Sequence, residues 1–434
     1  MTPPVPVPEE LVIAGGRPLR GTVRMPGCKG ISHRALLLAA LAEGRSRVTG
    51  AASAADVAST IGLTSALGVR IAPDGDALDI HSPGADGLVE PERIVDCANS
   101  GSTMRMGAGL VAGRPFLTVL AGDESLSRRP MGRVVDPLRA MGAAVDGRAG
   151  GELAPLVIRG RPLDGVRHDL AVASGQVKTA LVLAGLQARG TTEIHEPAAS
   201  RDHTERMLGA LGAPVDRIDA RTLRVGPGRP GPFEITVPGD PSSAAFVIVA
   251  ATLVPGSEVT VEAVSLNPGR IAFLDVLRTM GAAIEVRPTG EELGEPFGDV
   301  TARATPLRAA RIPASEAIID ELPVLAVAAA FAEGITEITG AAELAVKESD
   351  RIASVAATLR AFGVDVETAP DGLAVTGGRP RPAAVDSHGD HRIALAGAVA
   401  ALACDGESRI RDWPAVSVSY PQFERDVEAL RRGA

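Results

Sequence analysis

The sequence predicts an α/β (α+β) protein of two similar lobes, because two interleaved motifs each recur six times along 434 residues. The first motif is a small, apolar helical run that ends in glycine and precedes a strand-like stretch. Its glycines follow one another at intervals of 66 to 78 residues and are Gly44, Gly113, Gly190, Gly256, Gly334 and Gly406. The second motif is an amphipathic run that ends at a Leu-Gly, Met-Gly or Phe-Gly step before another strand. Its glycines are Gly68, Gly142, Gly212, Gly281, Gly363 and, in a truncated sixth copy, Gly433.

The apolar runs predict the first helix of each repeat. We expect these helices, each with its closing glycine at the C′ position, over 35–44, 104–113, 180–190, 244–256, 322–334 and 393–406. Strands rich in β-branched residues should follow at 46–51, 115–121, 191–197, 257–263, 335–341 and 408–413. Each repeat therefore alternates strands with helices.

Three repeats on each side of the chain's centre predict the two lobes. The Gly/Pro-rich stretch 226–240 is the expected crossing point, so we assign 25–239 to one lobe and 1–24 with 240–434 to the other. The same stretch contains a formal Gly-x-Gly-x-x-Gly, but it leads into a strand and not a helix, which excludes a dinucleotide-binding fingerprint. Residues 288–298 lengthen one interval of the second motif and are interpreted as a loop-like insertion.

Composition excludes several classes of protein. Hydrophobic residues make up 45% of the chain and aromatic residues only 2%, so a globular core must be built from Ala, Val, Leu and Ile. A net charge of −9 without a long basic run argues against a nucleic-acid partner. Three cysteines without CxxC spacing favour a reducing cytosol, and neither a signal peptide nor a membrane-spanning run is visible. We therefore expect a soluble, cytoplasmic protein with no membrane partner.

Lysine is rare in this chain. Of 44 Lys+Arg residues, three are lysines (Lys29, Lys178 and Lys347), which leaves 44 − 3 = 41 arginines. A compact ammonium and a planar guanidinium are not interchangeable. Because all three lysines stand in Gly/Ser-rich or acidic contexts at the start of an apolar run, we interpret them as marks of an active site that handles anions.

The residues just before each first helix are polar, and helix N-termini attract anions through their N–H groups and the helix dipole. These segments are 29–34, 99–105, 174–178, 240–243, 320–321 and 390–392. Ordinary N-capping explains Asp240 and Ser242. It does not explain cations such as Arg34, Arg105 and Arg392 at the unfavourable end of a helix dipole. The pattern therefore predicts at least one multiply charged anionic ligand.

Two carboxylates and a further pair of cations belong to the same predicted site. Lys347 and Arg351 are spaced by one helical turn, which predicts a shared helix face. Asp320 and Glu348 each lie among these motifs and are our candidates for proton transfer.

Metal binding is not expected. His388 and His391 form an HxxH pair, but zinc needs a third and usually a fourth ligand, and no Cys or His cluster supplies them. We interpret His33 and His203 as polar pocket residues instead of ligands.

Ten segments, in order along the chain, resemble the 5-enolpyruvylshikimate-3-phosphate (EPSP) synthase family. They are MPGCKGISHRALLLAALAEG, DCANSGSTMR, SLSRRPMGRVVDPLRAMGA, SGQVKTALVLAGL, SRDHTERML, GDPSSAAF, IIDELPVLAVAAAFAEG, VKESDRI, GDHRIALAGAVAAL and VSVSYPQF. The resemblance implies two lobes, each of three βαβαββ units, with the active site in the cleft between them. It also implies a 3-phosphoshikimate 1-carboxyvinyltransferase of chorismate and aromatic amino acid biosynthesis. Such an enzyme transfers the enolpyruvyl group of phosphoenolpyruvate to the 5-hydroxyl of shikimate 3-phosphate and releases phosphate. The reaction passes through a tetrahedral intermediate and needs no metal or organic cofactor.

The resemblance further implies the residues of the site. Phosphoenolpyruvate is expected to bind Lys29, Gly101, Arg129, Gln176, Arg351 and Arg392. Shikimate 3-phosphate is expected to bind Lys29, Gly30, Arg34, Ser174, Gly175, Gln176, Ser200, Asp320 and Lys347. Asp320 is the implied proton acceptor, Glu348 its partner in handling the methylene proton, and Lys29 the third catalytic residue. We expect a monomer whose partners are these two small molecules.

Some positions depart from the family pattern: Cys28, Gly30, His33, Ser102, Ala345 and Val418. Gly30 stands where a serine usually contacts the acceptor's carboxylate, and His33 where asparagine is usual. Two alternatives remain open: an enolpyruvyl transferase paralogue with a different phosphorylated or nucleotide acceptor, and a non-catalytic anion-binding protein. The UDP-N-acetylglucosamine enolpyruvyl transferases are disfavoured because 123–132 lacks their loop cysteine. The presence of Asp320 and Glu348 argues against the non-catalytic alternative.

Overall fold

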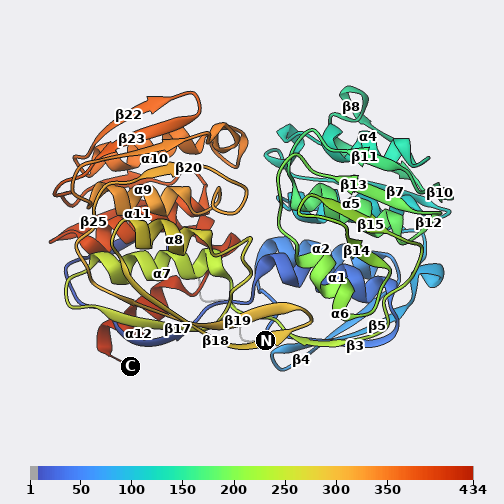
Figure 1. Ribbon diagram of the computed structural model, residues 1–434, viewed down its shortest axis with the longest axis horizontal. Helices are drawn as coiled ribbons and strands as arrows, with labels where there is room; N and C mark the ends of the chain where they lie inside the picture. Colours follow the sequence, from blue (N-terminus) through green and yellow to red (C-terminus); the bar gives the residue numbers. More distant parts are fainter. Residues whose placement is uncertain (1–7, 434) are drawn as a thin grey trace. The chain divides into compact units, whose positions relative to one another are not determined.

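The computed structural model describes residues 8–433, which divide into two compact units (Figure 1). Unit 1 comprises the N-terminal segment to Pro26, Gly239–Gly290 and the chain from Pro296 onward; unit 2 comprises Gly27–Pro238 and Glu291–Glu295. The sequence interpretation kept the last of these segments with 240–434, so it groups differently in the structure. Residues 1–7 of the expected first lobe lie outside the described residues.

Unit 2 contains three four-stranded sheets of the same design, in which one parallel pair is extended by two antiparallel strands. Their orders are β16 (Glu234–Thr236)–β3 (Glu43–Thr49)–β5 (Ala77–Pro83)–β4 (Arg70–Asp74), β6 (Val95–Asp96)–β7 (Leu117–Ala121)–β9 (Leu153–Arg159)–β8 (Ala144–Arg148), and β11 (Arg167–Asp169)–β13 (Thr192–His195)–β15 (Thr222–Val225)–β14 (Val215–Arg217). Two further short strands, β10 (Leu163–Asp164) and β12 (Ala188–Arg189), form a separate parallel pair. The last strand of the unit, β16, completes the sheet of the first repeat, so the unit closes on itself.

Unit 1 repeats this design in two sheets, and its third sheet has three strands. Its sheets are β2 (Arg20–Arg24)–β17 (Glu258–Ser265)–β19 (Glu295–Arg303)–β18 (Ala283–Glu292), β20 (Arg311–Pro313)–β21 (Ile335–Thr339)–β23 (Gly372–Thr376)–β22 (Asp365–Ala369), and β24 (Ala384–Asp386)–β25 (Glu407–Arg411)–β1 (Glu10–Ala14). The N-terminal strand β1 completes the sheet of the last repeat by pairing antiparallel with β25. The predicted α/β class, with its six strand-and-helix repeats, is confirmed.

The predicted loop-like insertion at 288–298 is wrong. This segment belongs to β18 and β19, which are neighbouring strands of one sheet. Gly298, Val300 and Ala302 of β19 are buried at alternate positions, as expected for a strand with one covered face. Glycine and charged residues around the turn conceal this period of two in the sequence.

The first helix of each repeat is buried along nearly its whole length, as an apolar surface on all sides requires. These helices are α1 (Lys29–Leu41), α3 (Gly101–Ala112), α5 (Gly175–Gly185), α7 (Pro241–Leu253), α9 (Leu322–Ala330) and α11 (His391–Ala403). Each begins at one of the predicted polar segments. Small residues let the helices approach closely: a Cβ added to Gly109 of α3 would lie 2.1 Å from the carbonyl oxygen of Ala180 in α5.

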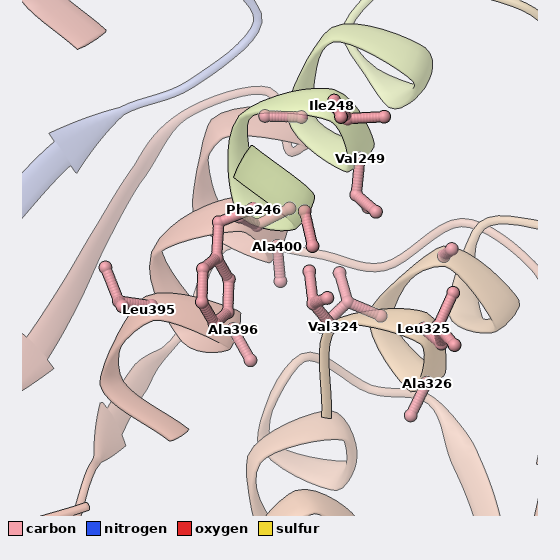
Figure 2. Close-up of a cluster of buried hydrophobic side chains, with 14 of the residues drawn as sticks. Phe246, Ile248, Val249, Val324, Leu325, Ala326, Leu395, Ala396 and Ala400 are labelled. Carbon is pink, nitrogen blue, oxygen red and sulfur yellow. The ribbon is translucent and has the colours of Figure 1, made fainter. Parts of the chain in front are cut away.

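The core of unit 1 is formed where α7, α9 and α11 contact one another. In Figure 2, Phe246 of α7 extends toward Leu395 and Ala396 of α11, and Val324 of α9 lies beside them. This aliphatic, alanine-rich packing is what the low aromatic content predicts. Although these helices are apolar, none in the part of the chain that is described is long and apolar enough to cross a membrane.

The second helix of each repeat is amphipathic. These helices are α2 (Ala55–Ala66), α4 (Gly132–Ala140), α6 (His203–Ala210), α8 (Ala272–Thr279), α10 (Arg351–Ala361) and α12 (Phe423–Arg432). The second-motif glycines close them with left-handed φ angles between 68° and 102°. Such angles favour glycine after a helix end.

The C′ position expected for the first-motif glycines is wrong. Helix α1 ends at Leu41, the next residue Ala42 is already extended, and Gly44 lies inside β3. In α3, Gly113 is the C-cap with a φ of −89°. Where the C-cap residue is already extended (Ala42, Val254 and Cys404), the glycine lies two residues after the C-cap and has a positive φ there, +119° at Gly44, +76° at Gly256 and +123° at Gly406.

Two glycines one turn apart test the difference between a glycine inside a helix and a left-handed glycine that follows it. Gly209 lies inside α6 and Gly212 follows it with a φ of +68°, and an added Cβ would meet open space at both. Gly209→Ala should raise the free energy of unfolding by about 0.5–1 kcal/mol, because alanine favours helix. Gly212→Ala should lower it by about 1–2 kcal/mol, because the left-handed conformation strains an L-residue. Urea unfolding of both variants measures the difference; changes of the same sign would contradict it.

Candidate active site

Two guanidinium groups and an amide gather at the N-terminus of α3. Arg105 Nη1 donates to Gln176 Oε1 at 2.8 Å, and Gln176 Nε2 donates to Ser102 Oγ at 2.9 Å. Gly101, the first residue of α3, faces them: an added Cβ would lie 2.8 Å from Arg105 Nη1 and 3.3 Å from Arg129 Nη1. Cations beside the positive end of a helix dipole make an arrangement suited to an anion. Gly101, Arg129 and Gln176 of the expected phosphoenolpyruvate set therefore lie together.

Lys29 is the first residue of α1 and forms an ion pair. Its Nζ lies 2.8 Å from Oδ2 of Asp56, in the first turn of α2, and the two side chains are 24% and 14% exposed. The carboxylate offsets the unfavourable position of a cation at a helix N-terminus. Sequence reasoning missed Asp56, because nothing in the spacing of 27 residues indicates that these two first turns meet.

Arg34 is buried and uses most of its donors on protein groups. Its Nε donates to Thr204 Oγ1, its Nη1 to the carbonyl of Gly30, and its Nη2 to the carbonyl of Gly175 and to Thr179 Oγ1, at 2.8, 2.9, 3.1 and 2.9 Å. Burial lowers the pKa of Arg34 to about 10, which keeps the guanidinium charged at neutral pH. Arg34 thus joins α1 to α5 and α6 around two residues of the expected acceptor set.

The remaining acceptor residues of unit 2 lie at and near the start of α5. Ser174 is the N-cap, and its side chain accepts a hydrogen bond from the N–H of Val177. Ser200 is buried, and its Oγ has no hydrogen-bond partner among residues 8–433. A buried hydroxyl is normally satisfied, so Ser200 is suited to contact a ligand.

The surroundings of Lys178 do not fit the anion-handling role that the rarity of lysine predicts. Its Nζ lies 2.9 Å from Glu196 Oε2 and 2.8 Å from Glu205 Oε1, and its side chain is 2% exposed. A buried ammonium held by two carboxylates offers little to a substrate anion, and removing it would leave two buried carboxylates without their partner. The interpretation of all three lysines as anion-handling residues is therefore wrong for Lys178.

His33 and His203 are both buried and hydrogen-bonded in unit 2. His33 Nδ1 lies 2.7 Å from Thr60 Oγ1, and His203 Nδ1 lies 2.7 Å from Glu295 Oε1. Burial lowers the pKa of His33 to about 3, against the opposing effect of the Asp56 carboxylate. The imidazole of His33 is therefore neutral at physiological pH.

In unit 1, three carboxylates surround the guanidinium of Arg351. Its Nε donates to Asp390 Oδ2 at 2.8 Å, its Nη2 donates to Glu348 Oε2 at 2.6 Å, and its Nη1 lies 3.6 Å from Asp320 Oδ1. Burial alone would lower the pKa of Arg351, but these carboxylates outweigh it and raise the pKa above its usual range. The two carboxylates chosen for proton transfer, Asp320 and Glu348, thus flank one cation.

Arg392, in the first turn of α11, approaches the same carboxylate. Its Nη1 donates to the main-chain carbonyl of Asp320 at 2.8 Å, and its Nη2 lies 3.6 Å from Asp320 Oδ2. Asp390 caps α11 by accepting from the N–H of Arg392, and Arg351 holds the pKa of Asp390 below its usual value despite burial. Sequence reasoning included the segment 390–392 but missed the role of Asp390 as the partner of Arg351.

The predicted helix face shared by Lys347 and Arg351 is wrong. Lys347 follows the 3-10 helix η4 (Ala342–Val346), whereas α10 begins at Arg351 after the N-cap Asp350. The Asp350 side chain accepts hydrogen bonds from the N–H groups of Ile352 and Ala353. This cap starts α10 at Arg351, so Lys347 lies outside that helix. Lys347 Nζ instead lies 3.6 Å from Glu343 Oε1.

The arrangement of potential metal ligands is a further feature predicted from the sequence. Within residues 8–433, no group of three or more His, Cys, Asp or Glu side chains is arranged to hold a metal ion. His388 is exposed and lies 3.5 Å from Asp386, whereas His391 is buried in the first turn of α11.

The low pKa of His33 predicts acid sensitivity. The unfolded chain binds a proton near pH 6.5 and the folded chain only near pH 3, so stability falls as pH decreases between these values. His33→Asn removes this titration. Between pH 7 and pH 5, wild type should lose about 2 kcal/mol more unfolding free energy than the variant.

Urea unfolding at the two pH values measures this loss. His81→Asn, at an exposed strand position, is the matched control and should follow wild type. Equal pH dependence of wild type and His33→Asn would contradict the assignment.

Comparison with known proteins completes this description. The family model for EPSP synthase (3-phosphoshikimate 1-carboxyvinyltransferase) matches residues 13–427. A 3-phosphoshikimate 1-carboxyvinyltransferase of Thermus thermophilus is 49% identical over 419 residues, covering 95% of this chain and 97% of the relative. A relative of the same name from Synechococcus sp. is 49% identical over 96% of this chain and 97% of its own length.

Solved structures agree with this match. An EPSP synthase from Acinetobacter baumannii superposes with a TM-score of 0.87 at 38% identity, covering 97% of this chain and 98% of that one. The enolpyruvyl transferase NikO from Streptomyces tendae shares the fold at 22% identity, with a TM-score of 0.77 and 97% coverage of both chains. The chain belongs to the EPSP synthase family.

Proposed function

We propose that this protein transfers the enolpyruvyl group of phosphoenolpyruvate to the 5-hydroxyl of shikimate 3-phosphate and releases phosphate. The observation that carries this proposal is the match of the EPSP synthase family model to residues 13–427. The residue clusters of both units supply the chemistry that this reaction needs.

The two substrates carry two phosphates and two carboxylates, so binding requires several cations. For phosphoenolpyruvate we propose Lys29, Gly101, Arg129, Gln176, Arg351 and Arg392. For shikimate 3-phosphate we propose Lys29, Gly30, Arg34, Ser174, Gly175, Gln176, Ser200, Asp320 and Lys347. The support from unit 2 is the gathering of Arg105, Arg129 and Gln176 at the start of α3. The support from unit 1 is the pair of guanidinium groups beside Asp320.

The reaction needs one group that takes a proton from the hydroxyl and another that serves the methylene carbon. In the addition step, Asp320 accepts the 5-hydroxyl proton as that oxygen bonds to C2, and Glu348 delivers a proton to C3. In the elimination step, the bond from C2 to the phosphate oxygen breaks, C3 returns its proton to Glu348, and phosphate leaves with the proton held by Asp320. Lys29 stabilises negative charge on the phosphate. The common contact of Asp320 and Glu348 with Arg351 supports this division of roles.

Gly30 does not exclude this acceptor. An added Cβ would first meet the ring of His203 at 3.4 Å, an ordinary contact, so position 30 has room for a ligand group or a small side chain. The partners of the enzyme are small-molecule substrates. Its monomeric state stays a prediction.

Release of inorganic phosphate from phosphoenolpyruvate tests the proposal. Purified protein should release phosphate with shikimate 3-phosphate and form the enolpyruvyl product in equal amount. Shikimate without the phosphate and UDP-N-acetylglucosamine serve as acceptor controls and should give little release. Activity with the nucleotide sugar but not with shikimate 3-phosphate would favour the paralogue, and binding of phosphoenolpyruvate without turnover of any acceptor would favour a non-catalytic protein.

Lys29→Arg tests whether a compact ammonium is needed. The larger planar guanidinium keeps the charge but cannot occupy the same position 2.8 Å from Asp56 with the same reach toward a phosphate. Turnover should fall at least tenfold, which corresponds to about 1.4 kcal/mol in barrier. Arg45→Lys, at an exposed position in the same unit, is the charge-conserving control and should leave turnover unchanged. Near-normal turnover of Lys29→Arg would refute the requirement.

A further inference from the structure

A chain of buried polar side chains runs from the second turns of α1 and α2 to the start of α3, and we call it the hydroxyl chain. It joins His33 Nδ1, Thr60 Oγ1, Thr103 Oγ1 and Ser100 Oγ, with 2.7 Å between each neighbouring pair. None of the four residues is more than 1% exposed. The activity proposed above assigns no role to any of them.

The hydroxyl chain lies one helical turn from the ion pair of Lys29 and Asp56. His33 follows Lys29 by four residues on α1, and Thr60 follows Asp56 by four residues on α2, so each pair shares a helix face. Two contacts therefore join α1 to α2: the ion pair of Lys29 with Asp56 at the helix starts, and the hydrogen bond between His33 and Thr60 one turn later.

One assignment of the protons satisfies every hydrogen bond in the hydroxyl chain and leaves the buried Nε2 of His33, which has no hydrogen-bond partner among residues 8–433, as an acceptor and not a donor. When Thr103 Oγ1 donates its single proton to the main-chain carbonyl of Asp56 at 3.2 Å, it accepts from both neighbouring hydroxyls. Thr60 therefore donates to Thr103 and accepts from His33 Nδ1. This requires a proton on Nδ1 of a neutral imidazole, which agrees with a pKa of about 3 for His33.

We propose that the hydroxyl chain positions Asp56, and with it the ammonium of Lys29, for phosphoenolpyruvate. His33, Thr60 and Thr103 are then positioning residues and not catalytic ones. This inference rests on the proposed function, since it assigns a purpose to groups behind Lys29.

The two ends of the hydroxyl chain explain why it would matter for binding. One end is on α1, four residues after Lys29, and the other is Ser100, the N-cap that precedes Gly101 on α3. Both Lys29 and Gly101 belong to the proposed phosphoenolpyruvate set. Apolar packing is non-directional and holds helices together without fixing their rotation, whereas buried hydrogen bonds fix relative positions because a misplaced partner is left unsatisfied.

Thr60 offers a matched set of variants. Thr60→Val keeps the side-chain shape but leaves the buried N–H of His33 without its acceptor, and relief of that loss requires the first turn of α1 to move. Thr60→Ser keeps the hydroxyl. Thr64→Val is the control, because Thr64 is also fully buried on α2 but donates only to carbonyls of its own helix. We expect Thr60→Val to raise KM for phosphoenolpyruvate at least about threefold, with KM for shikimate 3-phosphate changed less. Thr60→Ser and Thr64→Val should both stay within about twofold of wild type.

His33 tests the other end of the chain. An asparagine amide can donate the same hydrogen bond to Thr60, so His33→Asn should retain a nearly normal KM for phosphoenolpyruvate. His33→Leu removes the donor and should raise this KM as Thr60→Val does. The double variant His33→Leu/Thr60→Val leaves no orphaned N–H, so its loss should be smaller than the product of the single losses.

The outcomes separate this inference from the proposed function. If wild type releases no phosphate with shikimate 3-phosphate, the proposed function fails before any variant is compared. If wild type is active and Thr60→Val or His33→Leu lowers only the melting temperature, with KM for phosphoenolpyruvate unchanged, the hydroxyl chain is merely structural and the inference is overturned. Should Thr60→Val be unfolded at the assay temperature, His33→Leu and the double variant decide the question by the same KM comparison.

Discussion

The candidate site of unit 1 depends on the buried guanidinium of Arg351. A buried charge that loses its partners destabilises a fold strongly, so Asp390 and Glu348 must remain beside this cation. The same requirement keeps Asp320 within 3.6 Å and allows three carboxylates to share one small volume. Without Arg351, mutual repulsion would raise the energy of that arrangement. The interaction that stabilises this part of the fold therefore also brings together the two groups proposed to move protons.

The repeated architecture explains why charged groups gather only at certain places. The first helix of every repeat is surrounded by core, so its middle and end accept small apolar residues and little else. Polar residues are tolerated in the first turn, where N–H groups need partners and anions are stabilised. The buried cations are Arg392, in the first turn of α11, and Arg34 and Arg105, one turn further into α1 and α3; protein oxygens already accept several of their hydrogen bonds.

Periodicity predicted the fold and the positions of the helix starts, because both depend on local composition. It failed where pairing is non-local. The hairpin of β18 and β19 reads as a loop because glycine and charged residues interrupt its alternation, and its strand character comes from pairing with β17. The ion pair of Lys29 and Asp56 and the link from His33 to Thr60 each join residues 27 positions apart, and neither spacing identifies a contact. The family motifs name candidate site residues but not these supporting contacts.

The rarity of lysine has a different explanation from the one that the sequence first indicates. Lys29 and Lys178 are each paired at 2.8–2.9 Å with carboxylates in confined positions, one at a helix start and one in the core between Glu196 and Glu205. In both, a compact ammonium can direct its three donors to separate oxygens, which a planar guanidinium of larger size cannot do in the same space. At these two positions, the confined geometry explains lysine whether or not a substrate is near. Only the surrounding partners distinguish a proposed site residue such as Lys29 from a structural one such as Lys178.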